Sequence, residues 1–139
     1  MPVDSESLRE LARQYTAAWG SQDAASVAAF FAPNGSLKVN ENEPAVGREA
    51  IAEVADGFMS AFPDMTVLMD DLIVDGDRAV YRWTLLGTNT GPGGTGRAVR
   101  VSGFEEWRIS PEGLIGESLG HFDSEDYQRQ LEGRADATD

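Results

Sequence analysis

The segment GESLGHFD at residues 116–123 runs directly into SEDYQRQL at residues 124–131. It predicts a final β-strand that ends on a carboxylate, Asp123, and passes at once into a short amphipathic helix. His121, the only histidine of the chain, lies two residues before Asp123. Side chains two positions apart on a strand point to the same face, so we expect any reactive site to lie here.

The sequence before this segment has the pattern of consecutive β-strands. Strands are predicted over residues 65–74, 78–90, 97–110 and 114–123, with turn sequences at 75–77 and 111–113 and a glycine-rich loop at 91–96. Strands that follow one another through such turns pair with their neighbours. The second half of the chain is therefore predicted to form an antiparallel meander.

The first half has helical periodicity instead. Helices are predicted over residues 7–19, from 21 or 23 to 32, and over 48–62, and a short strand is predicted over 36–40. The second helix is expected to carry Val27, Phe30 and Phe31. Three helices followed by a curled sheet predict an α+β fold, in which a cone-shaped antiparallel sheet wraps around the N-terminal helices. We expect a single domain over residues 1–139, with a core at about 5–131 and a polar tail at 132–139.

Composition argues against several classes of function. The 24 acidic and 11 basic residues give a net charge of -13, which repels phosphate backbones and anionic lipids, so neither nucleic acid nor membrane is expected as a partner. The chain has no cysteine, and a single histidine among scattered carboxylates lacks metal-ligand spacing. With no long apolar run and no signal-peptide pattern, we expect a soluble cytoplasmic protein without metal or cofactor.

One carboxylate stands on an otherwise apolar strand face. Val99, Val101, Trp107 and Ile109 share a face with Glu105, and we assign this face to the inside of the cone. Two alternatives remain for Glu105: its carboxylate ends in water at the mouth, or it pairs with Arg82.

Polar and apolar residues alternate less clearly along the last strand. Glu117, Leu119, His121 and Asp123 are assigned inward, mainly because this groups the ionisable residues around a pocket. The alternative for His121 is a hydrogen-bonded structural histidine. The alternative for Asp123 is the N-cap of the helix that follows, a position that needs an acceptor.

Seven large apolar side chains are, taken one by one, more typical of a hydrophobic core than of a binding site. Together they would line the deep end of a small-molecule pocket. The predicted lining residues are Tyr15, Trp19, Phe30, Phe58, Phe62, Trp107 and Leu119.

The chain resembles the nuclear transport factor 2-like superfamily and, within it, the SnoaL-like polyketide cyclases and ketosteroid isomerase-like proteins. The resemblance covers most of the chain, and its order and spacing are more specific than any one motif. It rests on Tyr15-x3-Trp19-x3-Asp23, on GREAI at 47–51, FPDM at 62–65, GDRAV at 76–80, RWTLLGT at 82–88 and TGR at 95–97, and on Asp123 with RQL at 129–131.

The resemblance implies a cone whose pocket is closed by helices, and a homodimer formed through the outer face of the sheet. Candidates for that outer face are Trp83, Leu85, Phe104 and Phe122.

The resemblance also implies that the carboxylate at Asp123 removes a proton next to a carbonyl without a cofactor. We therefore expect a cyclase or isomerase acting on a small apolar or carbonyl-containing molecule. Asp123 would be the base, His121 or Glu105 its partner, and Arg82 the cation that stabilises an enolate.

Two alternatives remain for the function. The first is a non-catalytic dimeric module that binds a ligand. The second, ranked lower, is an epoxide hydrolase-like enzyme, which would need a carboxylate where the chain has Thr84.

Overall fold

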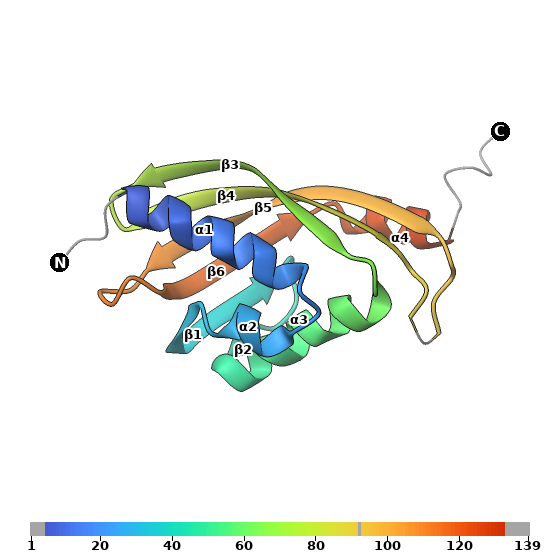
Figure 1. Cartoon of the computed structure of the whole chain (residues 1–139), viewed down its shortest axis with the longest axis horizontal. Coiled ribbons are helices and arrows are strands. Elements are labelled where there is room, and N and C mark those ends of the chain that lie inside the picture. Colours follow the sequence, from blue (N-terminus) through green and yellow to red (C-terminus); the bar gives the residue numbers. More distant parts are fainter. Residues whose placement is uncertain (1–4, 92, 133–139) are drawn as a thin grey trace.

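The computed structural model describes residues 5–91 and 93–132 and has an α+β architecture (Figure 1). The elements follow one another as α1 (Ser5–Trp19), α2 (Ala24–Ala28), β1 (Phe31–Val39), β2 (Ala45–Val46), α3 (Arg48–Ala61), β3 (Thr66–Asp75), β4 (Arg78–Thr88), β5 (Ala98–Ile109), β6 (Ile115–Phe122) and α4 (Ser124–Glu132). Seven of the eight residues of the predicted tail, 133–139, lie outside the described residues, and residue 132 ends α4.

The six strands form one curved, unclosed sheet in the order β2-β1-β6-β5-β4-β3. The meander from β3 to β6 is antiparallel, as the turn sequences predict. The sheet differs from a purely antiparallel prediction at β1, which pairs with β6 in parallel. Figure 1 shows the long strands arched over α1, α2 and α3, so the helices cover the concave face.

The predicted second helix is wrong in its second half. Helix α2 ends at Ala28, and Phe31 begins β1, where it pairs with Ile115 of the last strand. Tertiary pairing overrides the local helical pattern here. The strand is irregular between Phe31 and Ser36, because Pro33 has no N–H to donate and Gly35 approaches Ile115 closely. A Cβ at Gly35 would lie 2.9 Å from the carbonyl oxygen of Ile115.

Helices α1 and α3 present the apolar faces that their spacing predicts. Leu8, Ala12 and Tyr15 of α1 are fully buried, as are Ile51 and Ala55 of α3. These faces pack onto the concave side of the sheet and form its core.

The glycine-rich loop is fixed to the end of α3. Asn89 donates its side-chain amide to the carbonyl of Ala61, and its side-chain oxygen accepts the backbone N–H of Thr95. Gly91 lies so close that a Cβ there would meet the carbonyl oxygen of Ser60 at 1.8 Å. The loop after β4 is therefore held against the helix that covers one end of the sheet.

Candidate functional site

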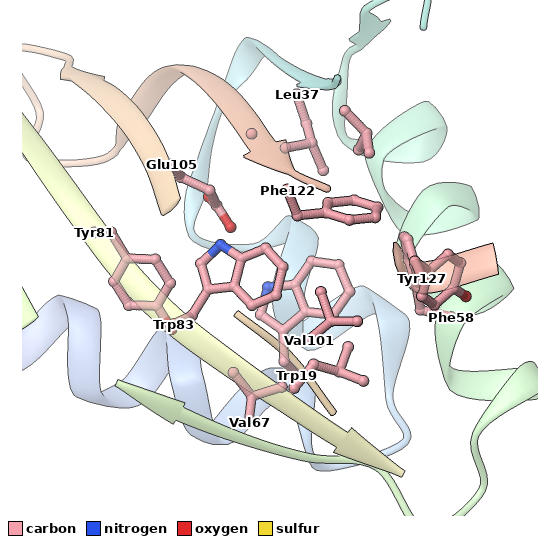
Figure 2. Close-up of a pocket in the computed structure, with 13 residues that line it drawn as sticks. Trp19, Leu37, Phe58, Val67, Tyr81, Trp83, Val101, Glu105, Phe122 and Tyr127 are labelled. Atoms are coloured by element: carbon pink, nitrogen blue, oxygen red, sulfur yellow. The ribbon is translucent and has the colours of Figure 1, made fainter. Parts of the chain in front are cut away.

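A largely apolar pocket lies between the concave face of the sheet and the helices. Its volume is about 70 Å³, which leaves room for several waters or a small organic molecule. Its aromatic walls come from α1, α3, β4, β6 and α4, and Figure 2 shows six of these side chains around the central space: Trp19, Phe58, Tyr81, Trp83, Phe122 and Tyr127. Leu37, Val39, Val67, Leu85 and Val101 supply the aliphatic walls.

Glu105 is the carboxylate of this pocket. It is 7% exposed, and it accepts hydrogen bonds from Tyr15 Oη at 3.0 Å, Trp107 Nε1 at 2.8 Å and Ser118 Oγ at 2.7 Å. All three donors converge on Oε1. The other oxygen, Oε2, has only the Tyr15 hydroxyl at 3.4 Å. One carboxylate oxygen is thus anchored, and the other keeps spare acceptor capacity.

Burial raises the pKa of Glu105 above its ordinary value. The hydrogen bonds from Trp107, Ser118 and Tyr15 lower that pKa but do not cancel the effect of burial. Burial also raises the pKa of Tyr15 well above its ordinary value, and the nearby carboxylate adds to this. Tyr15 is therefore a donor to Glu105 and remains protonated.

The inward assignment of Glu105 is confirmed, whereas the face predicted for the last strand is wrong. In the antiparallel pair β5–β6, Glu105 lies opposite Gly120 and Trp107 lies opposite Ser118. Residues directly opposite each other share a face, so Ser118, Gly120 and Phe122 point inward. Glu117, Leu119, His121 and Asp123 consequently lie on the other side.

Asp123 caps α4. Its Oδ1 accepts the backbone N–H groups of Glu125 and Asp126, each at 3.1 Å, and the residue is exposed. This is the alternative that the sequence left open for Asp123. Its carboxylate satisfies the start of a helix and does not line the apolar pocket.

His121 and Arg82 lie on the outer face of the sheet. His121 Nε2 is 2.8 Å from Glu106 Oε2, and the imidazole stacks on Phe104, which also lies under the Arg82 guanidinium. Arg82, His121 and Asp123 do come together, in an open outer groove of about 440 Å³. Glu105 is on the opposite side of the sheet from Arg82 and does not pair with it, and its carboxylate is buried and does not end in solvent at the mouth.

The predicted pocket residues divide into two groups. Trp19 and Phe58 line the pocket. The others belong to the core or to the outer face. Tyr15, Phe62 and Trp107 are buried core residues, Phe30 packs edge-on against Tyr15, and Leu119 lies opposite Glu106 on the outer face.

The predicted outer face also needs correction. Trp83, Leu85 and Phe122 line the inner pocket, and Phe122 also borders the outer groove. Phe104 is the one candidate of the four that lines the outer groove alone. The register explains this result, because Trp83 is opposite Gly103 and Leu85 is opposite Val101, both on the face of Glu105.

Sequence reasoning missed Ser118, Tyr81 and Trp83 as parts of the site. A usable signal was present in the small residues Gly103 and Gly120, because large side chains need small neighbours across a sheet. A Cβ at Gly103 would lie 2.7 Å from Trp83 Cζ2. Glycine at this position lets the indole ring lie against β5.

The described residues contain no group of three or more His, Cys, Asp or Glu side chains able to hold a metal ion. Among the same residues, no helix is both long and apolar enough to cross a membrane.

Comparison with solved structures places this architecture among ketosteroid isomerase-like folds. A protein with such a fold from Catenulispora acidiphila, solved in complex with trimethylamine, superposes with a TM-score of 0.78 at 16% identity, over 88% of this chain and 92% of the other. TsrD from Streptomyces laurentii gives a TM-score of 0.80 at 26% identity, over 93% and 97% of the two chains. SalBIII, described as an epoxide hydrolase/cyclase-like enzyme in pyran ring formation, gives 0.76 at 18% identity, over 88% and 95%.

Residues 9–131 match the family described as SnoaL-like polyketide cyclase. The match spans most of the chain, which therefore belongs to this family, as the sequence resemblance predicts. No curated protein matched the chain.

Proposed function

We propose that this protein binds a small, mainly apolar molecule in its inner pocket, and that Glu105 acts there as a cofactor-free general acid/base next to a carbonyl group. The observation that carries the proposal is the asymmetry of the Glu105 carboxylate. Three donors hold Oε1, while Oε2 has only a 3.4 Å contact, and Glu105 lines an apolar cavity. Membership of a cyclase family supports this class of chemistry.

The position and pKa of Glu105 suit proton transfer to and from carbon. An ordinary glutamate is a weak base at neutral pH, but burial raises the pKa of Glu105 and makes the ionised form more basic. Oε2 would take a proton from the carbon next to the carbonyl, and the electron pair of the broken C–H bond would move to the carbonyl oxygen as an enolate. Returning the proton to another carbon gives isomerisation, whereas attack of the enolate on a second carbonyl gives ring closure.

Hydrogen exchange tests this proposal without knowledge of the natural substrate. Cyclohexanone would be incubated with the protein in heavy water, and deuterium incorporation next to the carbonyl would be followed by proton NMR. We expect the protein to accelerate exchange and Glu105→Gln to lose that acceleration by about 100-fold or more. The amide keeps the shape and the Oε1 acceptor of the native side chain.

The matched control is Asp123→Asn, which preserves a capping acceptor on the outside of the molecule. We expect it to exchange at the rate of the unaltered protein. Undiminished exchange in Glu105→Gln, or loss of exchange in Asp123→Asn alone, would overturn the assignment of Glu105.

A non-catalytic binding module is the second candidate, and one observation favours it. The three hydrogen bonds on Oε1 tie α1, β5 and β6 together through Glu105, which is the arrangement of a structural anchor. Binding of cyclohexanone without any acceleration of exchange would select this alternative.

An epoxide hydrolase-like reaction has less support from the geometry. Thr84 faces away from the pocket and donates its hydroxyl to Asp70 at 2.6 Å. Glu105 is the carboxylate that lines the pocket in the described part of the chain, and no second acid faces it there.

The predicted homodimer and cytoplasmic location stay predictions. Phe104 is the one candidate that lies on the outer sheet face, where it stacks with His121. Light scattering of the protein and of Phe104→Glu would test association through this face, because a buried charge at a dimer interface shifts the equilibrium to monomers.

A further inference from the structure

Two indole N–H groups in the pocket have no hydrogen-bond partner. Among the described residues, Trp19 Nε1 and Trp83 Nε1 are the buried side-chain nitrogen or oxygen atoms without a partner. Both residues line the same pocket. Trp107, the remaining tryptophan, donates its N–H to Glu105 and does not line the pocket. The unpaired donors are therefore confined to the place where a ligand would bind.

An indole N–H can only donate, so a buried one needs an acceptor from elsewhere. The surrounding walls are mainly hydrocarbon, and the acceptor among them, Glu105 Oε2, is not hydrogen-bonded to either indole. Figure 2 shows the indole nitrogen of Trp83 on the side of its ring that faces Glu105, and Trp19 lines the same pocket. Trp19 packs edge-on against Tyr15, with ring centroids 6.3 Å apart. Its N–H is near enough to the Tyr15 hydroxyl to lower the pKa of Tyr15 slightly against the larger effect of burial, but the two groups lack the geometry of a hydrogen bond.

The neighbouring strand fixes the orientation of the Trp83 side chain. Gly103 lies directly opposite it on β5, and any Cβ at that position would collide with both the indole and the Cβ of Phe122, at 2.7 and 2.9 Å. The ring therefore lies flat over a backbone that cannot carry a side chain. A fixed donor of this kind selects for ligand geometry as well as for ligand polarity.

We propose that the indole N–H groups of Trp19 and Trp83 bind the acceptor oxygen of an uncharged ketone-type ligand and position its adjacent carbon toward Glu105. This inference rests on the proposed function of Glu105 and adds the donors that would stabilise the negative charge developing on the enolate oxygen. As the proton moves from carbon to Glu105 Oε2, the electron pair moves to the oxygen that the indoles hold. Both tryptophans are then positioning residues that also set specificity.

Three probes of similar shape separate the ligand classes. Cyclohexanone carries an acceptor oxygen, methylenecyclohexane replaces that oxygen by CH₂, and cyclohexylamine is a cation at neutral pH. Two-dimensional ¹H–¹⁵N NMR shows one indole signal for each of the three tryptophans. We expect cyclohexanone to move the Trp19 and Trp83 N–H signals downfield and methylenecyclohexane to leave them nearly in place. The Trp107 signal serves as the internal reference, because its N–H is already bound.

Matched variants give the energetic test. Trp83→Phe keeps an aromatic ring but removes the N–H, and we expect it to weaken cyclohexanone binding by about tenfold while leaving methylenecyclohexane affinity within about twofold. Phe58→Leu reduces the pocket wall without touching a donor, so it should affect both probes alike. The NMR experiment on the unaltered protein decides the question even if a variant does not fold.

The inference is overturned if cyclohexanone binds without moving either indole signal, if Trp83→Phe weakens all probes equally, or if cyclohexylamine binds more tightly than cyclohexanone. These results are distinguishable from failure of the proposed function. Indole shifts without Glu105-dependent deuterium exchange would support the donor pair and reject Glu105 as the base. Glu105-dependent exchange without indole shifts would support Glu105 as the base and reject the donor pair.

Discussion

Replacing Ser118 by alanine removes one of the three donors that hold Glu105. Ser118 is fully buried, and its hydroxyl lies 2.7 Å from Glu105 Oε1. A hydrogen bond to a charged partner contributes about 1.5–3 kcal/mol, and one to a neutral partner contributes about 0.5–1.5 kcal/mol. The cost of Ser118→Ala should therefore depend on whether Glu105 is ionised.

The sign of the pH dependence follows from the raised pKa of Glu105. The folded protein holds the proton more tightly than the unfolded chain, so its stability falls as pH rises from the ordinary value of 4.5 through the folded pKa. The Ser118 hydrogen bond lowers the folded pKa, and its removal raises that pKa further. The stability of Ser118→Ala should then fall more with rising pH than that of the unaltered protein.

Urea unfolding followed by tryptophan fluorescence would measure this difference between about pH 5 and about pH 8.5. We expect the loss of unfolding free energy to grow from about 0.5–1.5 kcal/mol at the acid end to about 1.5–3 kcal/mol at the alkaline end. Ser110→Ala is the matched control, because Ser110 is 8% exposed and its hydroxyl accepts a neutral backbone N–H at 3.2 Å. A loss that stays constant with pH, or an equal trend in the control, would refute the reasoning.

Other consequences of the structure can be checked independently. Asp123→Ala should cost about 0.5–2 kcal/mol by removing the cap of α4, with faster hydrogen exchange at the start of that helix, whereas unchanged exchange would contradict the capping role. Gly91→Ala should lower stability by about 1–3 kcal/mol because its Cβ would collide with backbone. Gly57→Ala, with nothing within 4 Å of the new Cβ, should raise stability by about 0.5–1 kcal/mol in the same urea unfolding assay. His121→Ala should cost less than about 1 kcal/mol, and this cost should shrink further in high salt, because the pair with Glu106 is exposed.

The sequence predicted the elements whose signals are local. The apolar spacing of Leu8, Ala12 and Tyr15 identifies α1, and the turn signals identify the meander, because helix and hairpin patterns repeat within a few residues. The local pattern around Phe31 predicts a helix, because its partner in the sheet, Ile115, is remote in sequence. No local pattern contains that pairing.

The candidate site was only partly predictable. The face of Glu105 could be recognised because its neighbours on β5 are apolar. The inner face of β6 could not, because Ser118 and Gly120 are small in order to fit beside Trp107 and Glu105, and small residues look like a polar outer face. His121 and Asp123 group with a pocket only if ionisable residues are assumed to cluster, and the strand register places His121 on the outer face instead. The irregular register between Arg108 and Ile109 adds to that difficulty.

The parallel pairing of β1 with β6 has a consequence for how the chain acquires its pocket during synthesis. Phe31 leaves the ribosome long before Ile115, the residue it pairs with, so β1 cannot pair with β6 until the last strand has been synthesised. The pocket walls are divided in the same way, with Leu37 and Val39 on the early strand and Gly120 and Phe122 on the late one. A nascent or C-terminally truncated chain would expose β1 as an unpaired edge. A ligand can therefore bind only after translation has passed β6, because Gly120 and Phe122 form part of the pocket wall.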